Sequence, residues 1–339
     1  MPVTVIVGGQ FGSEGKGKVA HFFAKEMGAS VAVRVGGPNS GHTVISENGP
    51  VIFKQLPTAA ILPDVQCVLP AGSYISPAIL LEEIRLTNLT PERLFIDPNS
   101  IVITNGDLEE ERISGIRSTI GSTLSGTGSA VSARINRLGR VRLARDEESL
   151  KPFIRQTTPF LREQLNKNER IIVEGTQGFG LSVLHSQVYP FATSRDTTAA
   201  SFVSEAGLSP MDVDDIVLVI RAFPIRVSGN SGPLPNEFSW EELTSESCSK
   251  SPIIEYTSVT KTIRRVARFD PEIVCQAIMY NRPTRIVLNH LDYCDAESSS
   301  QQDHTPKTLS FLRHIEAEIG SRVEYAGLGR NHLMPISEA

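Results

Sequence analysis

A glycine-rich segment at residues 8–18, GGQFGSEGKGK, carries the strongest chemical signal in the chain. Backbone N–H groups of such a segment approach phosphate oxygens closely, and a helix that begins there adds partial positive charge. The stretch from Gly12 to Lys18 fits the G-x-x-x-x-G-K pattern of phosphate loops, but Val19 stands where the common form has a magnesium-binding serine or threonine. We therefore predict a divergent phosphate loop. Its candidate ligands for donor phosphates are Gly12, Glu14, Gly15, Lys16, Gly17 and Lys18.

A second glycine-rich segment, GGPNSGHT at residues 36–43, places His42 among small residues that leave room for a ligand. A histidine in this setting can donate a proton or a hydrogen bond to a charged oxygen. A purely structural histidine is the alternative. Asn39, Gly41 and Thr43 are further candidate ligands in the same segment.

Hydroxyl and basic side chains follow one another between residues 120 and 140. IGST at 120–123 leads into GTG at 126–128, and three spaced arginines come next. Hydroxyls, backbone N–H groups and guanidinium groups together suit a phosphate monoester, although a solvated basic helix is an equal alternative. The candidates are Ser122, Thr123, Arg134, Arg137 and Arg140.

Three later segments complete the set. EGTQG at 174–178 follows an apolar run, and Gln177 offers a donor and an acceptor to a base edge, with Thr193 fifteen residues beyond the end of that segment.

TSVTKTIRR at 257–265 combines hydroxyls with paired arginines and suits a dicarboxylate. NHLD at 289–292 could present Asp292 to both N–H groups of a guanine edge, and Gly327 and Gly329 could close over the same nucleotide.

Alternating strands and helices must position these segments. Strands are predicted at residues 3–7, 31–35, 67–69, 94–96, 170–173, 216–221 and 285–288, and helices at 18–27, 79–86, 148–165 and 271–280. This alternation indicates an α/β fold with a single doubly wound, mostly parallel sheet and helices on both faces, whose ligands lie beyond the carboxyl ends of the strands. Residues 228–252 and 296–307 are predicted to be exposed loops, and residues 1–339 a single domain.

Composition narrows the class of protein. The 339 residues carry a net charge of −5, which disfavours a nucleic-acid partner. The four cysteines form no CxxC pair, so reduced thiols are expected rather than a disulfide framework or zinc site. The N-terminus lacks the pattern of a signal peptide, and no apolar run is long enough for a membrane span. We expect a protein of the cytoplasm, or of the host-cell cytoplasm if a phage encodes it.

The order and content of these motifs resemble the adenylosuccinate synthetase family. LPTAAILPDVQCVLPAG at 56–72, YPFATS at 189–194 and RRVARFD at 264–270 extend the resemblance to nearly the whole chain. The resemblance implies a ligase that uses GTP, Mg²⁺ and L-aspartate to convert IMP to adenylosuccinate. In that family an aspartate side chain of the phosphate loop assists attack of the purine 6-oxygen on the γ-phosphate, and a histidine acts as the acid. The amino group of the substrate L-aspartate then displaces the 6-phosphoryl group.

The resemblance assigns roles to individual residues. His42 corresponds to the acid, Lys16 and Lys18 to donor-phosphate ligands, and Ser13 and Gly41 to the magnesium site. Thr123 and Arg137 correspond to ligands of the nucleotide phosphate, with Arg137 reaching the partner subunit of a homodimer. The remaining matches are Asn39, Ser122, Gln177 and Thr193 at the purine nucleotide, Val227, Thr257, Ser258, Val259, Thr260 and Arg264 at aspartate, and Asn289, Asp292, Gly327 and Gly329 at the donor nucleotide.

Ser13 is the main departure, because the family has aspartate there. A serine hydroxyl is too weak a base at neutral pH without help. The same serine occurs in bacteriophage enzymes similar to 2-aminoadenylosuccinate synthetase, which act on dGMP and lead to 2-aminoadenine for phage DNA. A smaller, uncharged residue leaves space for a purine 2-amino group, and Thr262 stands where a ribose-reading arginine is expected.

The sequence therefore favours a ligase for dGMP and aspartate. An enzyme acting on IMP with GTP, or a catalytically weak nucleotide-binding protein, are the alternatives. The phosphate donor stays open among ATP, dATP and GTP, as does the group that replaces the missing loop aspartate.

Overall fold

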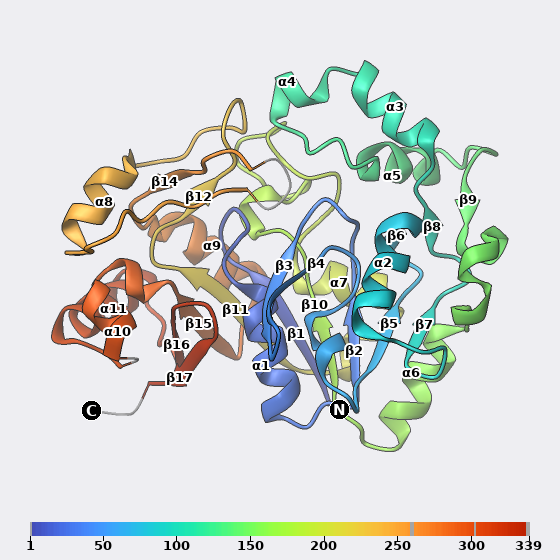
Figure 1. Ribbon diagram of the computed structural model, residues 1–339, viewed down its shortest axis with the longest axis horizontal. Coiled ribbons are helices and arrows are strands. Elements are labelled where there is room, and N and C mark those ends of the chain that lie inside the picture. The colour runs from blue at the N-terminus through green and yellow to red at the C-terminus, as the bar shows by residue number, and fades with distance from the viewer. Residues whose placement is uncertain (1, 258–260, 302, 337–339) are drawn as a thin grey trace.

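The computed structural model describes residues 2–257, 261–301 and 303–336. Its main sheet has nine strands in the order β17-β16-β15-β11-β1-β10-β2-β5-β7 (Figure 1). Every neighbouring pair in it is parallel except β16 with β17. The strands are β1 (Val3–Gly8), β2 (Val31–Arg34), β5 (Gln66–Leu69), β7 (Leu94–Ile96), β10 (Ile171–Glu174), β11 (Val213–Arg221), β15 (Arg285–Asn289), β16 (Tyr325–Leu328) and β17 (His332–Pro335).

Helices cover both faces of this sheet, as predicted. Side chains alternate along a strand, so Val5 and Val7 of β1 join one core while Ile6 joins the other. β1 is buried on both faces. Its sequence, VTVIVG, is therefore mostly apolar and does not alternate between apolar and polar residues as a half-exposed strand does. One face packs on α1 (Lys16–Glu26); the other packs on α6 (Thr157–Asn166), α7 (Ala199–Ala206), α9 (Pro271–Asn281) and α11 (Pro306–Ile319).

Smaller elements surround the carboxyl edge of the sheet. The hairpin β3 (His42–Ser46) and β4 (Gly49–Phe53) follows β2, and two three-stranded sheets lie further out. In Figure 1, α3, α4 and α5 form the upper rim, with β12 and β14 to their left. The remaining strands and α-helices are β6 (Tyr74–Ile75), β8 (Ile101–Val102), β9 (Arg142–Leu143), β12 (Ile225–Arg226), β13 (Glu237–Phe238), β14 (Arg265–Ala267), α2 (Pro77–Thr87), α3 (Asn105–Ile113), α4 (Ile116–Ile120), α5 (Thr127–Ile135), α8 (Trp240–Glu246) and α10 (Ala296–Gln301).

The continuous helix predicted at residues 148–165 is wrong. A 3-10 helix (Glu148–Phe153) and α6 occupy this range, with extended residues between them. Pro152 lies in the 3-10 segment, and proline disfavours helical conformation in the residue before it. The N–H of Arg155 donates to the carbonyl of Ile96 (3.0 Å) instead of to a helical carbonyl. The edge of the sheet therefore interrupts the helix.

The two predicted loops contain more structure than expected. Residues 228–252 include β13 and α8, and residues 296–307 include α10 and the start of α11. Capping boxes begin α8 at Ser239 and α11 at Thr305. In each, the side chain of the capping residue accepts a hydrogen bond from the backbone N–H three residues later, and the side chain of that later residue accepts one from the backbone N–H of the capping residue. Among the described residues, no helix combines the length and apolar character needed to cross a membrane.

Candidate active site

The phosphate loop joins the end of β1 to the start of α1, as predicted, and its conformation depends on left-handed residues. Gly12, Ser13 and Gly15 have φ angles of 89°, 57° and 90°. A side chain at Gly15 would lie 2.7 Å from the amide nitrogen of Asn289, so glycine is required there for space as well as for conformation. The loop is therefore held between the ends of β1 and β15.

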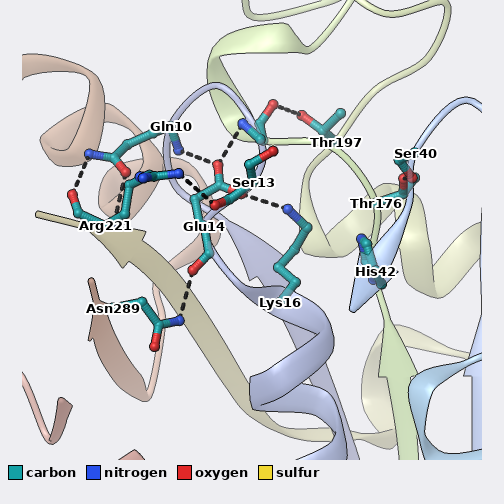
Figure 2. A network of polar contacts seen from close by, with 12 residues as sticks. Gln10, Ser13, Glu14, Lys16, Ser40, His42, Thr176, Thr197, Arg221 and Asn289 are labelled. Atoms are coloured by element: carbon teal, nitrogen blue, oxygen red, sulfur yellow. Dashed lines mark hydrogen bonds and ion pairs between the residues drawn. The ribbon is translucent and has the colours of Figure 1, made fainter. Parts of the chain in front are cut away.

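Glu14 is fully buried beneath this loop, and its carboxylate binds the loop itself (Figure 2). It accepts hydrogen bonds from the N–H groups of Gly12 (2.8 Å) and Gln10 (3.1 Å), and it pairs with the ammonium group of Lys16 (2.7 Å). Asn289 donates to the Glu14 carbonyl (2.7 Å). Glu14 thus shapes the loop and pairs with Lys16, although the sequence suggested it only as a phosphate ligand.

Lys18 lies beside the C-terminal hairpin of β16 and β17. Its ammonium group donates to the carbonyls of Gly329 (3.2 Å) and His332 (3.3 Å). Burial lowers its pKa to about 8, against the opposing effect of the Asp292 charge. Among the described residues, one carboxylate oxygen of Asp292 is buried without a hydrogen-bond partner. Such an oxygen is available to a donor group of a bound base.

His42 begins β3 and is buried against the carboxyl ends of β2 and β10. Its Nδ1 lies 2.5 Å from Oε1 of Glu174 and also contacts the guanidinium of Arg34. Burial, and then the charge of Arg34, lower the pKa of the imidazole to about 3. A side chain at Gly17 would lie 2.8 Å from Cβ of His42, so the glycine after Lys16 allows the ring to approach the phosphate loop.

Ser13 is bound by two arginines from other segments. Arg221, the last residue of β11, donates to its carbonyl (3.0 Å), and Arg264 donates to its hydroxyl oxygen. Glu255 pairs with both arginines. Burial alone would raise the pKa of Glu255, but the charge of Arg221, with His290 and Arg264 adding to it, holds that pKa at about 2. An anionic Glu255 therefore fixes the two cations around Ser13.

These groups surround one cavity of about 1140 Å³ at the carboxyl edge of the sheet. It is large enough for several small substrates together. Of the residues predicted from the sequence, it is lined by Gly12, Ser13, Gly15, Lys16, Gly17, Lys18, Asn39, Gly41, His42, Thr43, Ser122, Thr123, Gln177, Thr193, Val227, Thr257, Arg264, Asp292 and Gly329.

Several predicted residues do not line the cavity. Glu14 and Asn289 lie behind the phosphate loop, and a side chain at Gly327 would collide with Asn289 at 1.8 Å, so Gly327 provides space behind the wall. Arg137 is exposed to solvent outside the cavity of its own chain. The predictions for Ser258, Val259 and Thr260 fall outside the described residues.

The phosphate role expected for the segment after residue 126 is not met within one chain. The carboxylate of Glu111 accepts hydrogen bonds from the N–H groups of Gly126 (2.8 Å) and Gly128 (2.7 Å), so it caps α5 where a phosphate was expected. Arg134 donates to the carbonyl of Ala71 (2.8 Å), and Arg140 pairs with Asp107 and Glu110. Contacts within the chain therefore occupy the backbone N–H groups of Gly126 and Gly128 and two of the three arginines, Arg134 and Arg140.

Comparison with known proteins decides the family. The family model described as adenylosuccinate synthetase matches residues 5–145 and 141–300. The chain belongs to the adenylosuccinate synthetase family. It is 34% identical to the adenylosuccinate synthetase of Methanococcus aeolicus over 336 residues, covering 97% of each chain, and 34% identical to that of Methanocaldococcus jannaschii, covering 96% of this chain and 94% of the other.

Solved structures of the family agree with the fold. The succinoaminodeoxyadenylate synthetase PurZ of cyanophage S-2L, bound to dGMP and to dATP as an energy donor, superposes with a TM-score of 0.84 at 30% identity, covering 99% of this chain and 96% of that one. Fully ligated adenylosuccinate synthetase from Plasmodium falciparum superposes with a TM-score of 0.86, covering 99% and 100%. At 18% identity, the latter shows the fold alone.

The oxygen ligands that Ser13 and Gly41 could provide are compatible with Mg²⁺, the metal that the family resemblance implies. Ser13 and Gly41 both line the cavity, and a hydroxyl oxygen and a backbone carbonyl oxygen are ligands of the kind that Mg²⁺ binds. Among the described residues, there is no group of three histidine, cysteine, aspartate or glutamate side chains that could hold a metal ion. Mg²⁺ usually keeps several waters and binds substrate phosphates with few protein ligands, so a sparse set of oxygens fits it.

The sequence motifs assigned no role to the charged residues that end the central strands, although Glu174 begins the EGTQG motif. Arg34 ends β2, Glu174 ends β10 and Arg221 ends β11, and each contacts a predicted site residue. Their common signal is a charged residue directly after an apolar run that is buried on both faces. Ligands of an open parallel sheet lie at these strand ends, so a charge there points to the site.

Proposed function

We propose that this ligase joins L-aspartate to C6 of dGMP. The reaction consumes a nucleoside triphosphate and gives 2-amino-2′-deoxyadenylosuccinate, a nucleoside diphosphate and phosphate. Formation of a C–N bond follows from membership of the family, whereas the choice of dGMP is the proposal. The observation that carries it is Ser13 in the phosphate loop, at the position where the family has aspartate.

The surroundings of Ser13 support this choice. Its hydroxyl oxygen accepts a hydrogen bond from Arg264, so the hydroxyl proton is directed elsewhere and the group is a donor rather than a base. A carboxylate at the same place would be larger and charged, and it would pair with Arg264. The neutral serine leaves space for a purine 2-amino group. The 30% identity to a phage enzyme whose structure contains dGMP agrees with this reading.

The proposed acceptor site comprises Asn39, Ser122, Thr123, Gln177 and Thr193. Asn39 donates to the hydroxyl of Thr193 (3.5 Å). Among the described residues, the side-chain amide oxygen Oδ1 of Asn39 is buried without a partner, which leaves it available to a bound ligand.

Arg264, with Val227 and Thr257, is proposed to bind aspartate, because a guanidinium pairs well with a carboxylate. All three residues line the cavity. The segment between Thr257 and Arg264 carries further candidates that lie outside the described residues.

His42 is proposed to be the acid, and Lys16 and Lys18 are proposed to hold the donor phosphates. In the reaction, the purine 6-oxygen takes the γ-phosphoryl group and the nucleoside diphosphate leaves. The aspartate amino group then displaces phosphate from C6. Ser13 and Gly41 would hold Mg²⁺ together with phosphate oxygens, and bound Mg²⁺ neutralises phosphate charge.

The second candidate is conversion of IMP to adenylosuccinate with GTP. The 34% identity to two archaeal adenylosuccinate synthetases favours it, as does the unpartnered oxygen of Asp292, which suits the N–H edge of guanine in a donor. A weakly catalytic nucleotide-binding protein is the third reading. It does not explain why His42 is buried beside the start of α1, which carries both Lys16 and Lys18.

A matrix of substrates separates these readings. Release of phosphate is measured with dGMP, GMP, IMP or dIMP as acceptor and ATP, dATP or GTP as donor, each with and without L-aspartate. The proposal expects the highest kcat/KM with dGMP. A preference for IMP would replace it with the second candidate, and no aspartate-dependent release with any pair would favour the third.

A further inference from the structure

The segment that carries Arg264 folds back on itself, and its two arms bind each other. We call residues 253–264 the aspartate segment; the first arm ends at residue 257, the second begins at residue 261, and the residues between lie outside the described chain. The N–H of Arg264 donates to the carbonyl of Glu255 (2.9 Å). Tyr256 of the first arm forms an antiparallel bridge with Ile263 of the second. The backbone of one arm therefore sets the position of the other.

Helix α8 binds both arms of the aspartate segment from outside. The indole N–H of Trp240, the first residue of α8, donates to the carbonyl of Arg264 on the second arm (2.6 Å). The hydroxyl oxygen of Thr244 accepts from the N–H of Ile253 at the start of the first arm (2.9 Å). Residues four apart lie on the same face of a helix, so one face of α8 makes both contacts.

The core of the protein holds Trp240 in turn. Its side chain is 7% exposed and belongs to the core that also contains Leu218 of β11 and Leu288 of β15. Its ring meets the edge of the Tyr293 ring, with centroids 6.3 Å apart and planes at 80°. A large buried ring with few rotatable bonds holds its N–H in a fixed direction. Trp240 is thus a rigid donor aimed at the backbone of Arg264.

The position of this backbone determines where the Arg264 side chain can reach. The guanidinium donates through Nε to the carbonyl of Tyr256 (3.1 Å) and through a terminal nitrogen to the hydroxyl oxygen of Ser13. Pairing of a guanidinium with a carboxylate depends on direction as well as distance. The bond from Arg264 to Glu255 joins the two arms to each other, whereas the bond from Trp240 joins them to α8 and the core.

We propose that Trp240 is a positioning residue for L-aspartate, which fixes the backbone of Arg264 so that its guanidinium meets a carboxylate of the substrate. Thr244 has the same role for the first arm. Neither side chain is required for bond making, so both act on binding of aspartate rather than on the chemical step. This inference rests on the proposed function only in assigning aspartate to Arg264, and the choice between dGMP and IMP does not enter it.

The first test removes each contact and measures all three substrates. Trp240→Phe keeps an aromatic ring in the core but removes the N–H. It is expected to raise the KM for L-aspartate by ~3–10-fold, the range of one hydrogen bond between neutral groups. The KM values for both nucleotides and kcat should change little. Thr244→Val, which keeps the shape of the side chain, should raise the same KM. An unchanged KM for L-aspartate in both variants would overturn the proposal, as would equal rises for all three substrates.

Phe238→Leu is the matched control for lost packing. Phe238 of β13 is also an aromatic side chain beside the aspartate segment, and it packs on Phe223 and Arg268. Its replacement should lower the thermal midpoint while the KM for L-aspartate persists. If it raised this KM as much as Trp240→Phe does, the effect would come from packing, and Trp240 would have no positioning role.

The second test needs no turnover, because the chain contains one tryptophan. A ¹⁵N-labelled sample therefore gives one indole N–H signal that requires no assignment. Its exchange with water is expected to be slow, since the N–H is bonded to the Arg264 carbonyl. Exchange at the rate of a free indole, like an unchanged KM, would overturn the positioning role alone. Phosphate release that did not depend on aspartate with any nucleotide would instead contradict the proposed function and this role together.

Discussion

We expect turnover to depend more directly on the imidazole side chain of His42 than on any other single side chain. His42→Ala is expected to lower kcat by ~10²–10⁴-fold, the usual contribution of a positioned acid. His314→Ala on the exposed side of α11 is the matched control and should retain full activity. Steady-state kinetics together with circular dichroism of both variants checks the expectation. Near-normal turnover in the His42 variant would remove it from the reaction.

At the same scale, Ser13 is proposed to control the choice of purine. Ser13→Asp is expected to lower kcat/KM for dGMP by more than ~10-fold, because a carboxylate would crowd the 2-amino group and pair with Arg264. Ser13→Ala removes the hydroxyl without adding charge or bulk and should cost less. Kinetics with dGMP and IMP compares the variants. An unchanged preference for dGMP in the aspartate variant would show that other residues select the base.

Residue types and spacing predicted which polar groups would share a cavity, but not what holds them. His42, Lys16 and Arg264 follow from their motifs. The pairing of His42 with Glu174 does not, because it depends on how segments 132 residues apart meet. Glu14 comes from the same motif as Lys16, but the motif suggested it as a phosphate ligand and not as the partner of that lysine. The pairing of Glu174 with Arg34, for example, is set by the register of β10 against β2. No local pattern encodes that register.

At the scale of elements, the close approach of α1 to the β3 hairpin is set by Gly17. A side chain there would lie 2.8 Å from Cβ of His42 and 2.9 Å from Cγ2 of Thr58. Gly17→Ala is therefore expected to displace the hairpin and lower kcat at least ~10-fold, although alanine favours a helix. Gly139→Ala, where a side chain would meet open space, is the control. Equal kcat values for the two variants would contradict the packing argument.

Glu255 ties the segment that carries Arg264 to the end of β11, and this tie depends on pH. Its pKa is held at about 2, below its ordinary value, so the paired carboxylate stabilises the folded state. A lowered pKa contributes stability above the ordinary value, here up to about 3 kcal/mol, and the contribution is lost as pH falls toward 2. Thermal midpoints should therefore fall from pH 5 to pH 3 more steeply in the unmodified protein than in Glu255→Gln.

The exposed Glu82 on α2 provides the control for this measurement, because its pair with Arg85 is open to solvent. Glu82→Gln should leave the pH dependence nearly unchanged. An identical slope for the unmodified protein and the Glu255 variant would show that this carboxylate does not contribute.

The strands of the main sheet could be predicted more reliably than the segments around them. The runs at 3–7, 31–35 and 285–288 correspond to β1, β2 and β15 within a few residues. Burial on both faces makes such strands continuous apolar runs, which are easily recognised. The hairpin β3–β4, β16 and β17 lack that pattern, and the break before α6 arises from a contact with Ile96. These features depend on tertiary contacts.

At the scale of the whole molecule, Arg137 is exposed and does not line the cavity of its own chain. The residues beside it, Ile135 and Leu138, are 72% and 43% exposed, and such apolar side chains are often covered by another subunit. We expect a homodimer in which Arg137 reaches the cavity of the partner. Mixing Arg137→Ala subunits with His42→Ala subunits should then restore activity, because each mixed dimer has one intact site.

Light scattering checks the dimer, and differently tagged subunits allow the mixed dimers to be isolated before assay. Dimers of two Arg137→Ala subunits and dimers of two His42→Ala subunits are the controls. Inactive mixed dimers of confirmed composition would indicate that each site is built from one chain.

The division between strand ends and loops has a consequence for how such enzymes diversify. Arg34, Glu174 and Arg221 stand at strand ends, where neighbouring strands fix their positions, and a change in any of them disturbs several buried contacts. Ser13 stands on a loop that faces the cavity, so its side chain can be exchanged with little effect on the sheet. If Ser13 selects the purine as proposed, a lineage can acquire a new nucleotide substrate through a single loop substitution while the charged groups at the strand ends stay unchanged. Selection for a different acceptor base would then act on loop residues that line the cavity rather than on the ends of the strands.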